Sequence, residues 1–191
     1  MEKEDIIKYL NTNKVKNAEV LIDFLNKEED HYSRETLSGH ITGSSFIVND
    51  SLDQALLILH KKYNKWLSPG GHVDQNETAK VASNREATEE VGLSKLQLLK
   101  PEIFDIDIHK IGESIKNGKI EPEHWHFDVR YLYKAEKDCK VEVNIEETNG
   151  YKWNDLKMLA EVDDPSISRQ AKKAIEFAIS VKNKKIIKPK F

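Results

Sequence analysis

The strongest constraint on this chain is a set of three glutamates, Glu86, Glu89 and Glu90, at the helical spacing i, i+3 and i+4. At about 100° per residue, their carboxylates fall on one side of a single helix, within one turn of each other. Three like charges that close repel one another, and a divalent cation offsets the repulsion because Mg²⁺ and Mn²⁺ prefer oxygen ligands. A solvated acidic helix face is the alternative. The spacing therefore predicts a helix with a Mg²⁺ or Mn²⁺ site.

A glycine turn and two further charged residues lie next to these glutamates. The Gly-Gly pair that ends at Gly71 permits backbone conformations that other residues adopt only at a cost. Glu77 follows in the same loop, and Arg85 stands inside the acidic cluster. The helix is expected to run from about 78 to 91 and to end at Gly92, a residue type favoured in the left-handed position after a helix.

Small side chains share the face of the expected helix that carries the glutamates. Ala79, Ala82 and Ser83 project to this side at helical pitch, whereas an ordinary surface helix keeps its acids opposite its small apolar residues. Short alanines on an undemanding surface are the plainer explanation. The pattern favours a cleft in which another backbone, a metal or a phosphate approaches the helix closely.

Composition limits the classes of function that the chain can serve. A chain of 191 residues, 38% apolar and 33% charged, is typical of one globular domain with a hydrophilic surface. Its formal net charge of −3 gives no electrostatic footprint for long nucleic acid or an anionic membrane. Cys139 is the sole cysteine, and the sequence has neither a signal-peptide core nor a membrane-spanning run. We therefore expect a cytoplasmic protein.

The remaining periodicities indicate helices at both ends and strands between them. Helices are expected at about 3–10, at 17–29 with Asn17 as the cap, and at about 166–182. An antiparallel hairpin is expected from 39–48 and 55–59. The expected organisation is an N-terminal helical extension at 1–38 packed on the core, a main domain at 39–185 and a basic tail at 186–191.

Two later segments alternate in a way that predicts paired strands with one polar face. The polar positions are Asp105, Asp107 and His109 in the first strand, and His124, His126, Asp128 and Arg130 in the second. Pairing across the loop at 110–123 would merge these positions into one surface. A solvated sheet face explains the alternation as well. The functional interpretation is the floor of a substrate pocket beside the acidic helix, with Arg130 on a phosphate and the histidines on phosphate or base.

The pair His124 and His126 also raises zinc as a separate interpretation, because both side chains project from one face of a strand. Asp107 or His109 would then complete the site. The same imidazoles could instead move protons. Three other histidines are interpreted as structural or rim residues: His40, His60 and His72. Of these, His72 lies inside the glycine turn and is the one expected to touch substrate.

The segment from Gly71 to Leu93 resembles the Nudix box at every defined position. It reads Gly71, five residues, Glu77, seven residues, Arg85-Glu86, Ala87, one residue, Glu89-Glu90, one residue, Gly92 and Leu93. The strands around it resemble a Nudix fold from about 39 to 159. The resemblance implies an α/β fold of the α+β type, with a mixed, curved β-sheet between helices, extended here by the N-terminal helices and a C-terminal helix.

The resemblance also implies roles for the residues of the box. The implied metal ligands, for Mg²⁺ or Mn²⁺, are Glu86, Glu89, Glu90 and the carbonyl of Gly71. Arg85 and Glu77 resemble the internal ion pair that holds the loop against the helix. The implied reaction is hydrolysis of a diphosphate linked to another moiety, which converts nucleotide-X into a nucleotide and phosphoryl-X.

A carboxylate must take the proton of the attacking water in such a reaction. Glu89 and Glu90 are candidates, but a carboxylate fully engaged by metal is a poorer base. Glu147 precedes the stretch 151–156, which resembles the acid-then-tryptophan segment after the catalytic loop of many Nudix enzymes. Glu147 is therefore the leading alternative base, and a solvated loop acid is the plainer interpretation of it.

Substrate identity stays open at the level of sequence. A small nucleoside-diphosphate-type substrate is expected, and nucleotide sugars, modified nucleoside triphosphates, CDP-alcohols and capped RNA ends all fit. A catalytically silent module that senses a nucleotide is an alternative, although such modules usually lose box acids that are present here. An isopentenyl diphosphate isomerase is a weaker alternative, because Cys139 lies in a charged stretch unsuited to a catalytic cysteine. A homodimer is compatible with these expectations.

Overall fold

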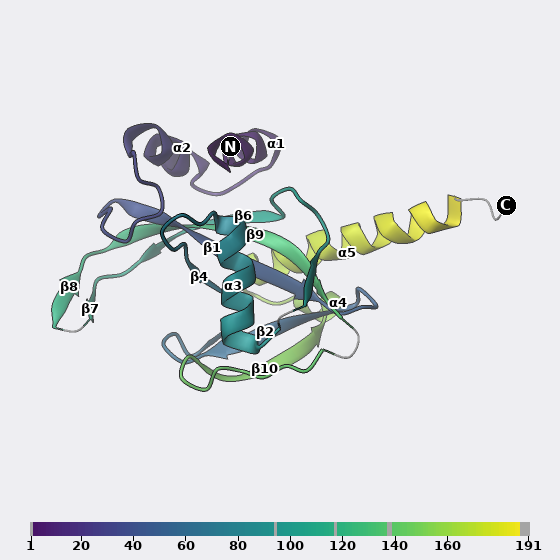
Figure 1. Cartoon of the computed structure of the whole chain (residues 1–191). Helices are drawn as coiled ribbons and strands as arrows, with labels where there is room; N and C mark the ends of the chain where they lie inside the picture. The colour runs from purple at the N-terminus through teal and green to yellow at the C-terminus, as the bar shows by residue number, and fades with distance from the viewer. Residues whose placement is uncertain (1, 94, 117, 137–138, 188–191) are drawn as a thin grey trace. The chain divides into compact units, whose positions relative to one another are not determined.

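The computed structural model describes residues 2–93, 95–116, 118–136 and 139–187 (Figure 1). Contacts between residues group the chain into two units. The first comprises Met1–Ser45, Gly70–Ala87 and Lys100–Tyr131, and the second comprises Phe46–Pro69, Thr88–Leu99 and Leu132–Phe191. The elements that begin in the first unit and end in the second are β1 (Gly39–Val48), α3 (Ala79–Val91) and β9 (His124–Ala135).

Antiparallel strand pairs form the framework of the first unit. β4 (Gly70–His72) pairs with β1, and Gly71 lies opposite Gly43. β6 (Asp105–Ile111) pairs with β9, and Asp107 lies opposite Asp128. This second pairing confirms the predicted merging of the two alternating segments. The loop between them carries a hairpin of β7 (Ser114–Lys116) and β8 (Lys119–Glu121) that the sequence analysis did not predict.

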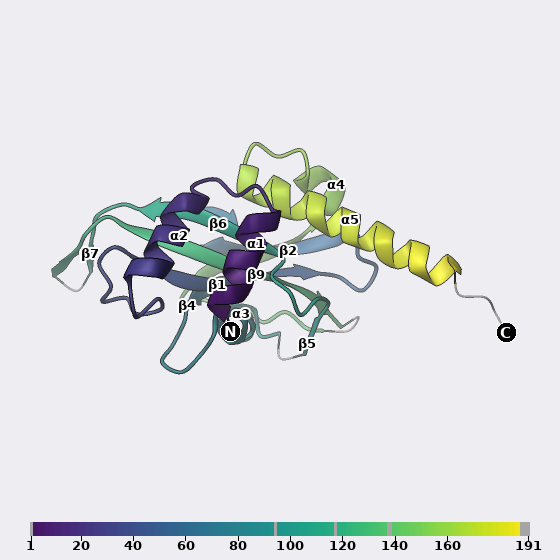
Figure 2. The same cartoon turned by 90° about the horizontal axis from the view of Figure 1, so that it is seen from above.

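Two N-terminal helices, α1 (Glu2–Thr12) and α2 (Ala18–Lys27), supply part of the apolar core of the first unit. Figure 2 shows both helices above β1, β6 and β9. The rings of Phe24 and Phe127 are buried with their centroids 4.6 Å apart. Burying a side chain of this size contributes about 1.5–3 kcal/mol to folding. The helices predicted at the N-terminus are confirmed.

Asn17 precedes α2, as expected, but does not cap it through its side chain. Its backbone is left-handed, with φ of 62°, and its side-chain amide donates a 3.4 Å hydrogen bond to the carbonyl oxygen of Ile108. The predicted position of the helix start is therefore right, and the predicted capping interaction is wrong. The left-handed backbone turns the amide away from the helix and towards β6.

The carboxylate of Glu2, on α1, accepts hydrogen bonds from the first amides of α3. The Ala79 amide donates at 3.0 Å and the Lys80 amide at 3.4 Å. The hydroxyls of Tyr131 and Tyr32 donate to the same carboxylate at 3.1 and 2.5 Å. The first amides of a helix have no partner within the helix, and a negative charge there also interacts favourably with the helix dipole. An N-terminal helix therefore caps the helix that carries the glutamates.

The second unit is built around β2 (Gln54–His60). This strand pairs antiparallel with β3 (Lys65–Leu67), with β10 (Thr148–Asp155) and with the end of β1, where Ile47 lies opposite Leu56. The last pairing confirms the predicted hairpin. β5 (Leu96–Leu98) pairs with the end of β9. Residues 55–58 of β2 are buried, as an apolar run of this kind predicts.

Helices α4 (Leu156–Leu159) and α5 (Pro165–Ile187) follow β10, and both begin at capping aspartates. Asp155 accepts from the first amides of α4, and Asp164 accepts from two amides in the first turn of α5. α5 continues past residue 182, where the predicted helix ended, and past 186, where the predicted tail began. Residues 188–191 of that tail lie outside the described residues, so the domain limits stay a prediction. Among the described helices, none combines the length and apolarity needed to cross a bilayer.

Candidate active site

The small-residue face of α3 packs against β1 in the first unit. A Cβ atom at Gly43 would lie 2.2 Å from the carbonyl oxygen of Ala79, so this approach requires glycine. The Ser45 hydroxyl donates a 2.5 Å hydrogen bond to the carbonyl oxygen of Ser83. Ala79 and Ala82 are fully buried. The predicted close approach is confirmed, and the group that approaches is the backbone of a strand.

The box glutamates lie on α3, a single uninterrupted helix that begins one residue later than predicted and ends before the left-handed Gly92. Glu86 is in the part of α3 that belongs to the first unit, and Glu89 and Glu90 are in the part that belongs to the second. Their order along a continuous helix preserves the predicted spacing. Glu90 is only 2% exposed, Glu86 is half-buried and Glu89 is exposed. Burial of a carboxylate is tolerated only with compensating partners.

Gly71 brings the β4 backbone into contact with the Glu86 carboxylate. A Cβ atom at this position would lie 2.4 Å from one Glu86 carboxylate oxygen and 2.8 Å from the other. Any side chain here would therefore displace the carboxylate. The two groups that the Nudix resemblance assigned to metal binding in this unit, Gly71 and Glu86, do lie together.

Arg85 ties the loop after β4 to α3. Its Nε and Nη2 donate to the Glu77 carboxylate at 3.0–3.1 Å, and its Nη1 donates to the Glu86 carboxylate at 3.0 Å. Nη2 also donates a 2.8 Å hydrogen bond to the carbonyl oxygen of His72. The predicted pair with Glu77 is confirmed, and the same guanidinium also orients a box glutamate.

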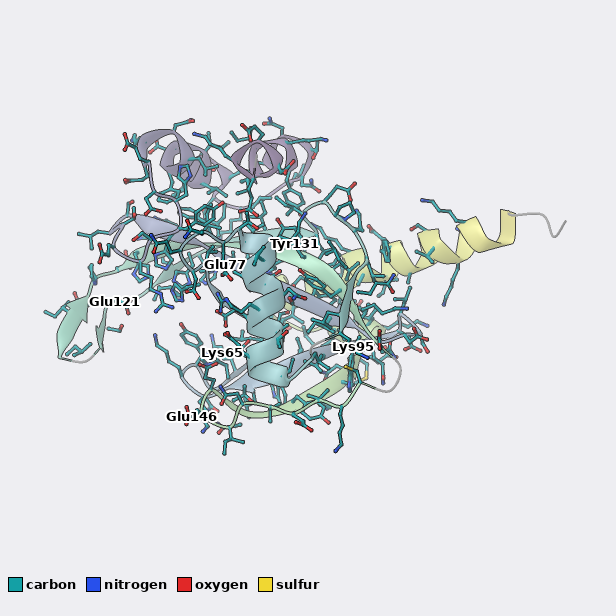
Figure 3. All side chains as sticks on the ribbon, in the orientation of Figure 1. Lys65, Glu77, Lys95, Glu121, Tyr131 and Glu146 are labelled. Carbon is teal, nitrogen blue, oxygen red and sulfur yellow. The ribbon has the colours of Figure 1, made fainter. Side chains whose placement is uncertain are left out.

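Charge complementarity accounts for the titration behaviour of this pair. The hydrogen bonds from Arg85 lower the pKa of Glu77 below its usual value, and the bonds to Glu77 and then Glu86 raise the pKa of Arg85. Both groups stay ionised at neutral pH. Figure 3 shows Glu77 beside α3.

The predicted alternative base, Glu147, lies in the second unit on the loop before β10, next to Glu146 (Figure 3). Its side chain is exposed, and its carbonyl oxygen accepts a 2.9 Å hydrogen bond from the Lys61 amide. Within the same loop, the Asn144 amide donates at 2.9 Å to the carbonyl oxygen of Glu90. The loop that carries Glu147 is therefore bonded to the end of α3 that carries Glu90.

Arg130 forms a buried ion-pair network between β6 and β9. Its Nε donates to Asp128 at 2.7 Å and its Nη1 to Asp105 at 3.3 Å, and Nη2 lies 3.7 Å from Asp107. The nearby carboxylates raise its pKa against the opposing effect of burial. Neutralised by several carboxylates, this guanidinium is better suited to holding the strands than to binding a phosphate. Its assignment to substrate stays a prediction.

Strand alternation separates two faces of the first unit. Gly43 and Ser45 on β1 face α3, so the intervening Thr42 and Ser44 point to the other face. The hydroxyls of Thr42 and Ser44 donate to Asp128 at 3.2 and 2.7 Å. The merged polar surface of β6 and β9 therefore lies on the face away from α3.

The expectation of a substrate floor beside Glu86 is consequently wrong in its geometry. Paired residues on neighbouring strands project to the same face of a sheet, and no pattern in the sequence predicted how β1 lies against β9. Contact between substrate and this polar surface stays a prediction. It now requires the substrate to reach the face of the sheet away from α3. The residues concerned are His72, His124, His126, Arg130 and Asp107.

A cluster of imidazoles occupies that second face. The ring centroid of His126 lies 4.7 Å from that of His40, 5.2 Å from those of His72 and His124, and 5.7 Å from that of His109. Burial, followed by the neighbouring imidazoles, lowers the pKa of His126 to about 2. Burial also lowers the pKa of His40 to about 4. The predicted grouping of His124, His126 and His109 is confirmed, whereas the central place of His40 was not predicted.

Comparison with known proteins places the chain in a family. Residues 40–175 match the family model described as the NUDIX domain. The chain belongs to the Nudix family. The expected α/β fold is confirmed by this match and by the helices and strands described above. Membership of this family makes the chain a Nudix hydrolase.

Solved structures share the Nudix fold with this chain. A hydrolase of the NUDIX family from Clostridium perfringens is 27% identical, with a TM-score of 0.53 over 72% of this chain and 97% of that one. A C. elegans Ap4A hydrolase is 19% identical, with a TM-score of 0.53 over 73% and 98%. The E. coli dihydroneopterin triphosphate pyrophosphohydrolase is 16% identical, with a TM-score of 0.54 over 80% and 99%. No curated protein matches the chain.

Removing the Arg85 clamp should lower both stability and activity. Arg85→Gln leaves the carboxylates of Glu77 and Glu86 without their guanidinium, and a hydrogen bond to a charged group contributes about 1.5–3 kcal/mol. Because the pair is partly exposed, we expect a loss of about 2 kcal/mol in the free energy of unfolding, measured by urea denaturation. A double-mutant cycle with Glu77→Gln should show coupling. Unchanged unfolding with lost activity would make Arg85 a substrate ligand instead.

Adding one methyl group at Gly71 should impair the Nudix box while preserving the fold. In Gly71→Ala the new Cβ displaces the carboxylate of Glu86, a predicted metal ligand, so we expect half-maximal activity at a higher Mg²⁺ concentration and at least ~10-fold lower kcat/KM. Gly112→Ala is the matched control, because a Cβ there meets no atom within 4 Å. Equal activity of the two variants would show that the Gly71 contact is dispensable.

Replacing Arg130 should destabilise the first unit strongly. Arg130→Met leaves buried aspartates without their counter-ion, and breaking a buried pair costs about 3–5 kcal/mol. Lys134→Met on the same strand is the control, because its ion pair with Asp50 is exposed and contributes about 0–1 kcal/mol. Chemical denaturation measures both. A stable Arg130→Met protein with a raised KM would restore the predicted phosphate contact.

Proposed function

We propose that this chain is a Mg²⁺- or Mn²⁺-dependent Nudix pyrophosphohydrolase. It would cleave the diphosphate linkage of a nucleoside diphosphate derivative, releasing a nucleotide and a phosphoryl compound. The observation that supports this most directly is the contact of Glu86 with Gly71 and Arg85 in the first unit. The uninterrupted α3 helix continues from Glu86 to Glu89 and Glu90.

The chemistry of the proposed ligands fits a hard divalent cation. Glu86, Glu89, Glu90 and the Gly71 carbonyl offer only oxygen donors, which Mg²⁺ prefers. The missing Cβ at Gly71 leaves room for the Glu86 carboxylate against the backbone, so two of these groups lie side by side. When bound, such a cation supplies charge neutralisation for the diphosphate and lowers the pKa of water.

The other box residues prepare these ligands for their role. Arg85 holds Glu86 in place and binds the loop at Glu77 and His72, which reduces the reorganisation needed when substrate arrives. Glu147 is the proposed acceptor of the proton from the attacking water. Support for it comes from its exposed carboxylate and from the hydrogen bond between its loop and the Glu90 carbonyl. Glu89 and Glu90 are the alternatives.

The proposed substrate is a small nucleoside diphosphate derivative. Two structures with the same fold bear the names of hydrolases for Ap4A and for dihydroneopterin triphosphate, which supports a small phosphoanhydride as the class. The polar face with His72, His124, His126, Asp107 and Arg130 lies away from Glu86, so contact between these residues and the substrate stays a prediction. Neither a long nucleic acid nor a membrane is proposed as a partner, and a homodimer stays a prediction.

A phosphate-release assay over a panel of diphosphates, with Mg²⁺, Mn²⁺ or chelator, tests the proposal. We expect turnover of at least one nucleoside diphosphate derivative that disappears with chelator. Glu90→Gln should fold normally and lose ~10²–10³-fold or more in kcat, the scale of one lost interaction in the transition state. Glu102→Gln, which alters an exposed acid outside the box, is the control.

Two outcomes would contradict the proposal. Full activity of a folded Glu90→Gln protein would remove this carboxylate from the mechanism. Tight binding of a nucleotide by calorimetry, without turnover of any panel member, would favour the silent sensing module. A fall in kcat for Glu147→Gln with unchanged metal affinity would support Glu147 as the base.

A further inference from the structure

We infer that His40, His124 and His126 form a second metal site, separate from the Nudix box, that binds a transition-metal cation such as Zn²⁺. Each residue offers one ring nitrogen, and these three atoms lie within 4.8 Å of one another. His40 comes from β1, and the other two come from β9. All three side chains are buried and belong to the first unit.

The ring nitrogens of His40 are buried and lack hydrogen-bond partners in the described part of the chain, which is unusual in a protein core. His40 is 1% exposed, and neither of its ring nitrogens has a hydrogen-bond partner among the described residues. Leaving a buried polar group without a partner is unfavourable. Buried polar side chains are normally satisfied, so an exception needs an explanation such as an unseen ion. A metal bound at one ring nitrogen of His40 would supply a partner for that nitrogen.

The hydrogen bond of His124 is one that metal-binding histidines commonly make. Its Nδ1 lies 2.8 Å from the carbonyl oxygen of Pro122, which can only accept. In a neutral imidazole Nδ1 is then the donor, and Nε2 keeps a lone pair. Metal-binding histidines usually donate their other ring N–H to a carbonyl or carboxylate in this way.

The ligand set selects the kind of cation. Imidazole nitrogens suit Zn²⁺, Cu²⁺ and Ni²⁺, whereas Mg²⁺ prefers oxygen. Three histidines leave a fourth position of a tetrahedral zinc open for water or another ligand. Zn–N distances of about 2.0–2.1 Å require ring nitrogens about 3.3 Å apart, so small ring rotations would close the site. His72 and His109 lie beside this cluster as further imidazoles.

The proposed site is separate from the Nudix box. It lies on the face of the β1 and β9 strands away from α3, whereas Glu86 contacts Gly71 on the α3 side. The two sites therefore use different donors on different faces.

To test the proposal, the full chain is stripped with chelator, loaded with Zn²⁺ and then dialysed with a large excess of Mg²⁺. We expect wild-type protein to retain about one equivalent of zinc by elemental analysis, because imidazoles outcompete water for Zn²⁺ while Mg²⁺ occupies carboxylates. His40→Leu and His126→Asn should each weaken zinc binding by at least ~100-fold in calorimetry. His60→Asn, which changes a histidine of the second unit, is the matched control and should bind as wild type does.

Cobalt provides a readout that needs no variant. Co²⁺ bound to wild type should give the intense visible absorption of a four-coordinate ion, and Zn²⁺ should abolish it. A weak octahedral spectrum would overturn the site even if His40→Leu fails to fold. Absence of retained zinc in wild type, or equal zinc affinity in folded His40→Leu and His126→Asn proteins, would overturn it as well.

Discussion

The guanidinium of Arg85 is the group on which the arrangement of the box depends. It faces the carboxylates of Glu77 and Glu86, and Asp74 lies 3.6 Å away. Without a cation at this point, the acids of the loop and of α3 would repel one another. Its bond to the His72 carbonyl also fixes the turn that brings Gly71 against Glu86. One side chain thus sets both the charge balance and the position of the backbone.

The first unit uses its two sheet faces for different purposes. On one face, glycine and serine of β1 admit α3 at backbone distance, which only very small side chains permit. On the other, β1 contributes His40, Thr42 and Ser44 to a polar interior that aspartates and Arg130 share. Because residues alternate along a strand, one ten-residue strand can serve both faces. The burial of the polar face explains why its hydroxyls, aspartates and Arg130 are bonded to each other.

Local patterns predicted much of this fold, and non-local neighbours account for what they missed. Alternation in 104–109 and 124–133 identified two strands and their pairing, because both signals lie within short segments joined by one loop. The box helix followed from its spacing and its terminal glycine. The place of His40 depends on which strand lies beside β1, and no local pattern encodes that neighbour. The side of the sheet that α3 covers was missed for the same reason.

Glu2 links the amino end of the chain to the helix that carries the box. Its carboxylate completes the first turn of α3 and also receives hydroxyls from Tyr32 and Tyr131. Purification strategy is affected by this contact. A tag fused immediately ahead of residue 2 would add bulk beside the carboxylate that caps the start of α3. Preparations that differ only in their leader peptide would then differ in metal requirement or turnover.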